Sequence, residues 1–151
     1  MNGLAMLDAN VLVYSDDSRS PSKSARARLL IQFLVERGLA VVTPQVLGEY
    51  WLAVTRKLAT PLPLDLAEAR IHEYRNFARV VPYDSVIVAE AVRGQRRYGF
   101  HYYDAQIWAA ARLAAIDVVF SEDFTDGSQI EGVRFANPFA DDFDMDAFLA
   151  S

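Results

Sequence analysis

Four acidic side chains are the residues of this 151-residue chain best placed for chemistry, because two come just after short apolar runs, one opens an apolar helix and one lies about one turn into a helix. They are Asp8, Glu49, Asp104 and Asp123. Carboxylates held close together repel one another and raise one another's pKa, so a cluster is tolerated mainly when a cation lies among them. Oxygen ligands alone suit Mg²⁺ or Mn²⁺. Two such ions can activate water and stabilise the leaving oxygen of a phosphodiester.

The strands and helices next to these acids are expected to bring the acids together. Leu4–Leu7, Ala40–Thr43 and Val118–Phe120 are short apolar runs typical of buried strands. Asp104–Ala115 is rich in alanine and apolar on nearly all sides, which predicts a buried helix. Parallel α/β sheets place their sites beyond the carboxyl ends of the strands. We therefore expect the acids to meet at one edge of the sheet.

The rest of the chain continues the alternation of strands and helices. Further strands are expected at Arg79–Pro82 and Val133–Phe135, and Asn10–Tyr14 is too short to assign. The intervening helices are expected over about 24–37, 46–58, 65–78 and 85–98, with Asp65 at one helix start and Asp84 or Ser85 capping another. This pattern predicts a single α/β domain over 1–137, with a mostly parallel sheet of about five strands flanked by helices. Residues 138–151 form an acidic and aromatic tail of the same domain.

Each acid also has a purely structural interpretation. Asp8 and Asp104 have side chains suited to capping helices. Glu49 lies off the apolar stripe of its helix, which favours a solvated surface position. Asp123 has acidic neighbours on both sides that compete for its role, one of them in an Asp-Gly turn signal. Spacing alone therefore does not distinguish a metal site from four acids with separate structural roles.

Composition narrows the function classes. The chain has no cysteine, which excludes disulfides, thiolate metal sites and a thiol nucleophile. Hydrophobic residues make up 52% and charged residues 23%, as expected for a folded domain. No apolar run approaches the ~18 residues of a membrane span, and no targeting segment is evident, so we expect a cytoplasmic location.

Five segments occur in an order that resembles a known family. They are Leu7–Tyr14, Gly48–Trp51, Tyr103–Ile107, Ser121–Phe124 and the ending Val133–Phe139. Together these segments resemble the PIN-domain family over nearly the whole chain. The most similar subgroup is the VapC-type toxins, which are small ribonucleases of toxin–antitoxin pairs.

The resemblance implies a Mg²⁺- or Mn²⁺-dependent endoribonuclease that hydrolyses RNA. The four family acids, which would hold the metals directly or through water, are Asp8, Glu49, Asp104 and Asp123. Water activated by the metals would attack the RNA phosphate in line. Asn10 and Thr43 would orient ligands or water. The resemblance also implies a homodimer and an inhibiting antitoxin protein whose tail enters the acidic groove.

Basic and aromatic residues lie just before Asp104. Candidates for binding RNA phosphates are Arg93, Arg96 and Arg97. The alternative interpretation is that these arginines form a solvated helix end, where the helix dipole favours positive charge. His101 is a candidate RNA contact rather than a metal ligand. The tail is either a docking strip or a frayed end.

Two other function classes compete with the ribonuclease. One is a PIN-like RNA-binding or regulatory module without catalysis, although the intact set of acids argues against it. The other is a phosphoryl-transfer enzyme of the haloacid-dehalogenase kind with Asp8 as nucleophile. Asn10 occupies the position where that class usually has a second Asp.

The net charge of −5 is compatible with an RNA substrate once the charges of the tail and of the proposed metal site are counted separately from those of the rest of the chain. The tail holds 4 of the 20 acids and no Lys or Arg, so 16 acids and 15 bases remain in residues 1–137. Removing the four proposed metal ligands leaves 12 acids against 15 bases. The body of the protein is therefore slightly basic apart from its proposed site.

Overall fold

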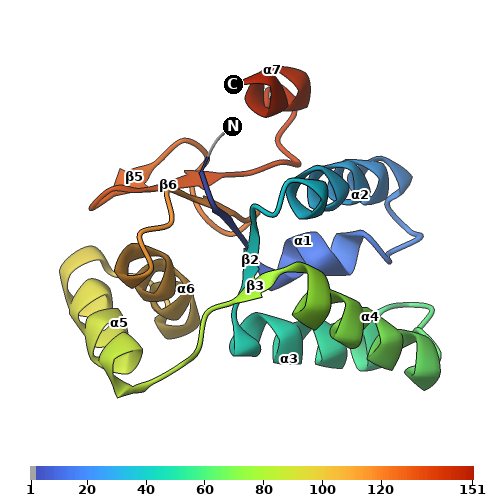
Figure 1. Ribbon diagram of the computed structural model, residues 1–151, viewed down its shortest axis with the longest axis horizontal. Helices are drawn as coiled ribbons and strands as arrows, with labels where there is room; N and C mark the ends of the chain where they lie inside the picture. The colour runs from blue at the N-terminus through green and yellow to red at the C-terminus, as the bar shows by residue number, and fades with distance from the viewer. Residues whose placement is uncertain (1–2) are drawn as a thin grey trace.

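A computed structural model describes residues 3–151 and shows one sheet with helices on both faces (Figure 1). The strand order is β3-β2-β1-β4-β6-β5. The strands are β1 Ala5–Leu7, β2 Ala40–Val42, β3 Arg79–Val80, β4 Val118–Phe120, β5 Gln129–Ile130 and β6 Val133–Ala136. All neighbours pair in parallel except β5 and β6. The predicted mostly parallel sheet is confirmed, but it has six strands because the two-residue β5 is too short to leave a sequence pattern.

Within residues 3–151, seven α-helices and one π-helical turn connect and cover the strands. They are α1 Ala9–Tyr14, α2 Pro21–Glu36, α3 Pro44–Leu52, the π-helical turn η1 Ala53–Lys57, α4 Leu64–Phe77, α5 Ser85–Tyr98, α6 Tyr102–Leu113 and α7 Met145–Ala150. Helix α6, backed by α5, lies on one face of the sheet, and α2 lies on the other (Figure 1). Within residues 3–151, no helix is both long enough and apolar enough to cross a membrane.

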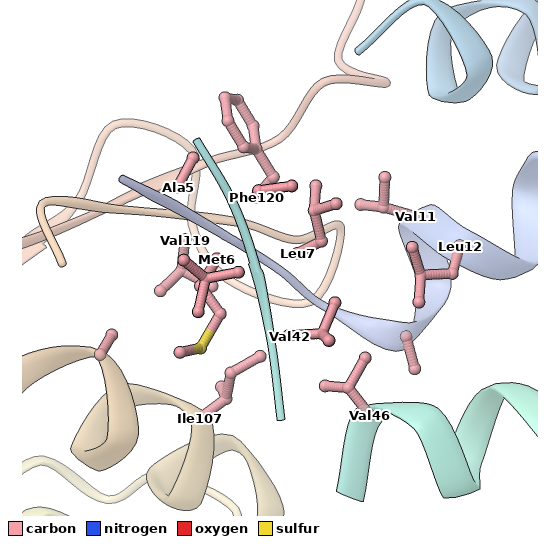
Figure 2. Packing of buried hydrophobic residues seen from close by; sticks show 14 of the residues in the cluster. Ala5, Met6, Leu7, Val11, Leu12, Val42, Val46, Ile107, Val119 and Phe120 are labelled. Carbon is pink, nitrogen blue, oxygen red and sulfur yellow. The ribbon is translucent and has the colours of Figure 1, made fainter. Parts of the chain in front are cut away.

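The central strands are apolar on both sides because helices cover both faces. Met6 and Val119 point toward Ile107 of α6, while Leu7 and Phe120 lie on the opposite side of the sheet (Figure 2). Full burial of each such side chain contributes about 1.5–3 kcal/mol to stability. This core fixes the carboxyl ends of β1 and β4 relative to α6.

Helix α6 is held closely against α5. Trp108 of α6 is fully buried, and a Cβ atom at Gly94 of α5 would overlap its indole ring. The indole Nε1 donates to the carbonyl oxygen of Ile130 at 3.2 Å, which ties α6 to β5. The start of α6, where Asp104 lies, is therefore fixed by packing rather than by the loop before it.

Several helix starts differ from those predicted. Asp84 caps α5 as expected, since its side chain accepts from the Ile87 N–H at 3.1 Å. Helix α4 begins at Leu64 after Pro63, so Asp65 is not its cap but lies in its first turn. Helix α6 begins at Tyr102, and Asp104 likewise lies in the first turn. An acidic side chain in a first turn still interacts favourably with the helix dipole.

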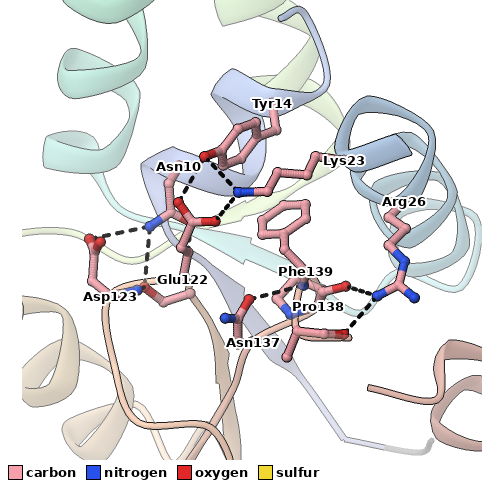
Figure 3. Close-up of polar contacts among 11 residues, drawn as sticks. Asn10, Tyr14, Lys23, Arg26, Glu122, Asp123, Asn137, Pro138 and Phe139 are labelled. Atoms are coloured by element: carbon pink, nitrogen blue, oxygen red, sulfur yellow. Dashed lines mark hydrogen bonds and ion pairs between the residues drawn. The ribbon is translucent and has the colours of Figure 1, made fainter. Parts of the chain in front are cut away.

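The tail beyond residue 137 contains a short helix that the sequence pattern did not predict. Asp144 caps α7 by accepting from the Ala147 N–H at 2.9 Å. Phe148 packs edge-on against Phe120 of β4, with ring centroids 5.0 Å apart. Arg26 of α2 donates to the carbonyl oxygens of the residues at 138 and 140 (Figure 3). The aromatic residues of the tail thus cover the sheet.

Candidate metal centre at the carboxyl edge of the sheet

Asp8 follows β1 and is the most buried acid of the site, with 7% of its surface exposed. Its Oδ1 accepts from the Ala9 N–H at 2.7 Å at the start of α1, and its Oδ2 accepts from the Ser121 Oγ at 2.7 Å. Burial raises the pKa of Asp8 to about 6, although these two hydrogen bonds act to lower it. Asp8 is therefore both a helix cap and a member of the acidic cluster.

Three of the four predicted acids come together at this edge. One carboxylate oxygen from each of Asp8, Asp104 and Asp123 lies within 4.8 Å of the others. Asp104 comes from the first turn of α6, and Asp123 comes from the loop after β4. Partial burial raises the pKa of Asp104, and the negative charge of Asp123 raises it further. The charge of Asp123 thus destabilises the ionised forms of both Asp8 and Asp104.

Glu49 lies on the same cleft as this cluster but outside the group of three. It is exposed on α3, where its Oε1 accepts from the Gln45 Nε2 at 2.8 Å. It lines a cleft of about 510 Å³ that also contains Asp8 and Asp123. Its charge contributes to raising the pKa of Asp8 and of Asp104. Glu49 therefore occupies the solvated surface position that its local sequence favours, and it also lies near the acidic cluster.

Asn10 and Ser121 orient the acids. The Asn10 Nδ2 donates to the Asp123 Oδ2 at 3.2 Å and to the Ser121 Oγ at 3.3 Å (Figure 3). Ser121 is fully buried and also accepts from the Asp123 N–H at 3.1 Å. Ser121 was not predicted as a site residue; its position directly after an apolar strand was the available signal.

Thr43 has a different local role. It is fully buried, and its Oγ1 accepts from the Val46 N–H at 3.1 Å, which caps α3. It therefore fixes the start of the helix that carries Glu49.

The other acids of the loop after β4 are engaged elsewhere. Glu122 accepts from the Tyr14 hydroxyl at 2.8 Å and pairs with the Lys23 Nζ at 2.8 Å (Figure 3). Asp126 accepts from the Asn137 N–H at 2.8 Å. Asp123 is thus the acid of this loop that joins the cluster.

The three arginines predicted to contact RNA do not line the acidic cleft. Arg93 forms ion pairs with Glu90 and Glu131, the latter at 2.9 Å. Arg96 and Arg97 lie beside it on α5. His101 is exposed immediately before α6, and its charge lowers the pKa of Asp104.

The three clustered carboxylates fit a divalent cation. Within residues 3–151, none of them forms an ion pair with Lys, Arg or His. An ionised carboxylate that is buried without a positive partner is costly. The oxygen-only donor set is the one that Mg²⁺ and Mn²⁺ prefer.

The sequence profile of a known family places this fold in the class of PIN domains. The PIN-domain family profile matches residues 5–125, and the chain belongs to this family. The resemblance seen in the sequence is thereby confirmed. No curated protein matches the sequence.

Three solved structures with low sequence identity share the fold. A toxin–antitoxin complex from Klebsiella pneumoniae has a TM-score of 0.63 at 17% identity, covering 89% of this chain and 98% of that one. VapC20 from Mycobacterium tuberculosis, a sarcin–ricin loop cleaving toxin, has a TM-score of 0.59 at 17% identity, covering 84% and 97%. VapBC2 from Rickettsia felis, bound to a promoter DNA fragment, has a TM-score of 0.62 at 12% identity, covering 89% and 98%.

Proposed function

We propose that this protein is a Mg²⁺- or Mn²⁺-dependent endoribonuclease and the toxin of a toxin–antitoxin pair. The observation that carries the proposal is the cluster of Asp8, Asp104 and Asp123 within 4.8 Å. Membership in the PIN-domain family supports it. The structural similarity to VapC20, a toxin that cleaves the sarcin–ricin loop, supports RNA as the substrate class.

In this proposal, Asp8, Asp104 and Asp123 hold the cation directly, and Glu49 takes part from the rim of the cleft. The bound cation supplies positive charge for the phosphate and lowers the pKa of a water molecule. Ser121 and Asn10 do not react; they hold the carboxylates of Asp8 and Asp123 in place. No side-chain nucleophile is needed.

We also propose an inhibiting antitoxin protein as a partner, as the family resemblance implies, and the acidic cleft indicates the charge of the segment that it would insert. Five acidic residues line it, namely Asp8, Asp17, Glu49, Glu122 and Asp123. A protein segment that blocks it should therefore be basic. Similarity to a toxin–antitoxin complex supports this partner. Co-expression with the product of a short neighbouring reading frame tests it, and failure of the two proteins to co-purify contradicts it.

A cleavage assay tests the activity. Purified protein is incubated with labelled RNA in Mg²⁺, in Mn²⁺ or in EDTA. We expect cleavage with either cation and none in EDTA, because the cluster then lacks the charge that the phosphate needs. Cleavage that persists in EDTA contradicts metal dependence. Binding of RNA without cleavage under all conditions favours the non-catalytic RNA-binding module instead.

We also propose a homodimer, supported by an exposed apolar stripe on α5. Val88 and Val92, one helical turn apart, are each 43% exposed. A Val92→Asp substitution should shift the protein from dimer to monomer, since it places a charge in the stripe. Light scattering measures the change, with Arg79→Asp on exposed β3 as the control. A monomeric wild-type protein contradicts the proposal.

A further inference from the structure

The cleft beside the acidic cluster also contains two cationic side chains, Lys57 and Arg19. We propose that Lys57, assisted by Arg19, binds the RNA phosphates next to the one held at the acidic cluster. This inference rests on the proposed ribonuclease function and assigns its substrate contacts. The two residues differ from the arginines of α5, none of which lines the cleft.

The cleft needs positive charge of its own to accept a polyanion. Five acids and only two bases line it. A cation at the cluster offsets the acids nearest the reacting phosphate but adds no positive charge beside the neighbouring phosphates. Phosphate binding by Lys and Arg supplies most of the sequence-independent affinity of nucleic-acid-binding proteins. The two bases of the cleft are therefore the groups that this binding requires.

The π-helical turn places Lys57 on the same side of its helix as Glu49. In a regular α-helix, Lys57 would lie about 80° around the axis from Glu49, eight residues earlier. In η1 the Leu58 N–H instead donates to the carbonyl oxygen of Ala53 at 3.1 Å, five residues back. This wider turn rotates less per residue and carries Lys57 back toward the stripe of Glu49 and Ala53. Such turns are rare and occur frequently at functional sites.

Lys57 is available for a ligand. Its side chain is exposed, and within the described part of the chain it forms no ion pair or side-chain hydrogen bond. The other lysine, Lys23, is engaged by Glu122 and by the hydroxyl of Tyr14. An ammonium group binds phosphate as a compact point charge and needs no fixed geometry.

Arg19 is held in place at the rim of the cleft. Its Nε and Nη2 both donate to the Asp17 carboxylate at 3.2 Å, and its backbone N–H donates there at 3.1 Å. Asp17 is buried, so the pair fixes a guanidinium that is otherwise on an exposed side chain. The Nη1 group keeps its donors free among residues 3–151. Because Asp17 offsets part of its charge, we assign Arg19 the smaller contribution.

The test compares Lys57→Ala with Arg56→Ala. Arg56 is the adjacent exposed residue of η1 and does not line the cleft, so this control removes the same charge one position away. Both changes, together with Lys57→Arg and Arg19→Ala, are made in an Asp104→Asn background, which we expect not to cleave because it lacks one acid of the cluster. Binding of a labelled RNA hairpin is measured by fluorescence anisotropy at several salt concentrations in Mg²⁺. Single-turnover cleavage of the same RNA is measured without the Asp104→Asn change.

We expect Lys57→Ala to weaken binding about 3- to 10-fold and to reduce the salt slope, d log K/d log[salt], by about 0.7, as for one lost contact to single-stranded nucleic acid. Arg56→Ala should leave both values unchanged, Lys57→Arg should restore them, and Arg19→Ala should have a smaller effect. Equal losses of affinity from Lys57→Ala and Arg56→Ala, or no loss from Lys57→Ala, overturn the assignment of Lys57. If the wild-type protein still cleaves RNA in that case, the proposed ribonuclease function stands. A wild-type protein that neither binds nor cleaves RNA overturns both.

Discussion

Replacing Asp8 with Asn should lower the RNA cleavage rate at least about 1,000-fold while leaving the fold intact. Such a loss corresponds to about 4 kcal/mol of transition-state stabilisation, the scale expected for a group that holds a catalytic cation. Asn has the same shape as Asp, and its Oδ1 can still accept from the Ala9 N–H. Its Nδ2 replaces the oxygen that accepts from the Ser121 hydroxyl at 2.7 Å. The negative charge and this one hydrogen bond are therefore lost.

The measurement is the single-turnover cleavage rate at saturating Mg²⁺, with circular dichroism to check the fold. Asp142→Asn is the matched control, because it removes one carboxylate from an exposed position in the tail. This control should cleave at the wild-type rate. An Asp8→Asn variant that cleaves as fast as wild type would show that the reaction occurs elsewhere in the molecule.

The second large effect is the pH dependence that Asp8 gives to the stability of the metal-free protein. Between pH 3 and 7 in EDTA, Asp8 should lower the free energy of unfolding by about 3 kcal/mol. Burial raises its pKa from 3.8 to about 6, and each unit is worth about 1.4 kcal/mol. Between these two values the folded state binds more protons than the unfolded state, so stability falls as pH rises. The stability is fully present below pH 3.8 and is lost through pH 6.

Urea unfolding of wild type and Asp8→Asn at a series of pH values isolates this effect, because the other titrating groups are common to both proteins. The difference between them should change by about 3 kcal/mol across the range. Adding Mg²⁺ at pH 7 should stabilise wild type and not the variant, since a cation favours the ionised carboxylate. A difference that does not vary with pH would mean that Asp8 is solvated rather than buried.

The sequence was sufficient to predict the framework of this site. The runs ending at Leu7, Val42 and Phe120 are apolar throughout because each strand is covered on both faces. Such runs stand out locally, and the residues after them are then confined to one edge of the sheet. The positions of Asp8 and of the loop containing Asp123, near each other at that edge, therefore follow from sequence patterns alone.

Helix ends were predicted less well. Asp84 caps α5 because its side chain meets a backbone N–H three residues away, which is a local interaction. Asp104 was expected to open α6, but the helix begins two residues earlier. Packing of Trp108 against Gly94 and its hydrogen bond to Ile130 fix that helix, and these partners are distant in the sequence.

Within the predicted framework, the tertiary structure decided which side chains form the site. Asp123 joins the cluster because Lys23 and Tyr14 engage Glu122. The side chain of Asn10 then holds Asp123 across 113 positions of sequence. Likewise, a single π-helical turn aligns Lys57 with Glu49, and neither residue type nor spacing predicts this turn. Burial and periodicity are local properties that a sequence displays, whereas the choice among chemically similar side chains depends on partners that only the folded chain brings within bonding distance.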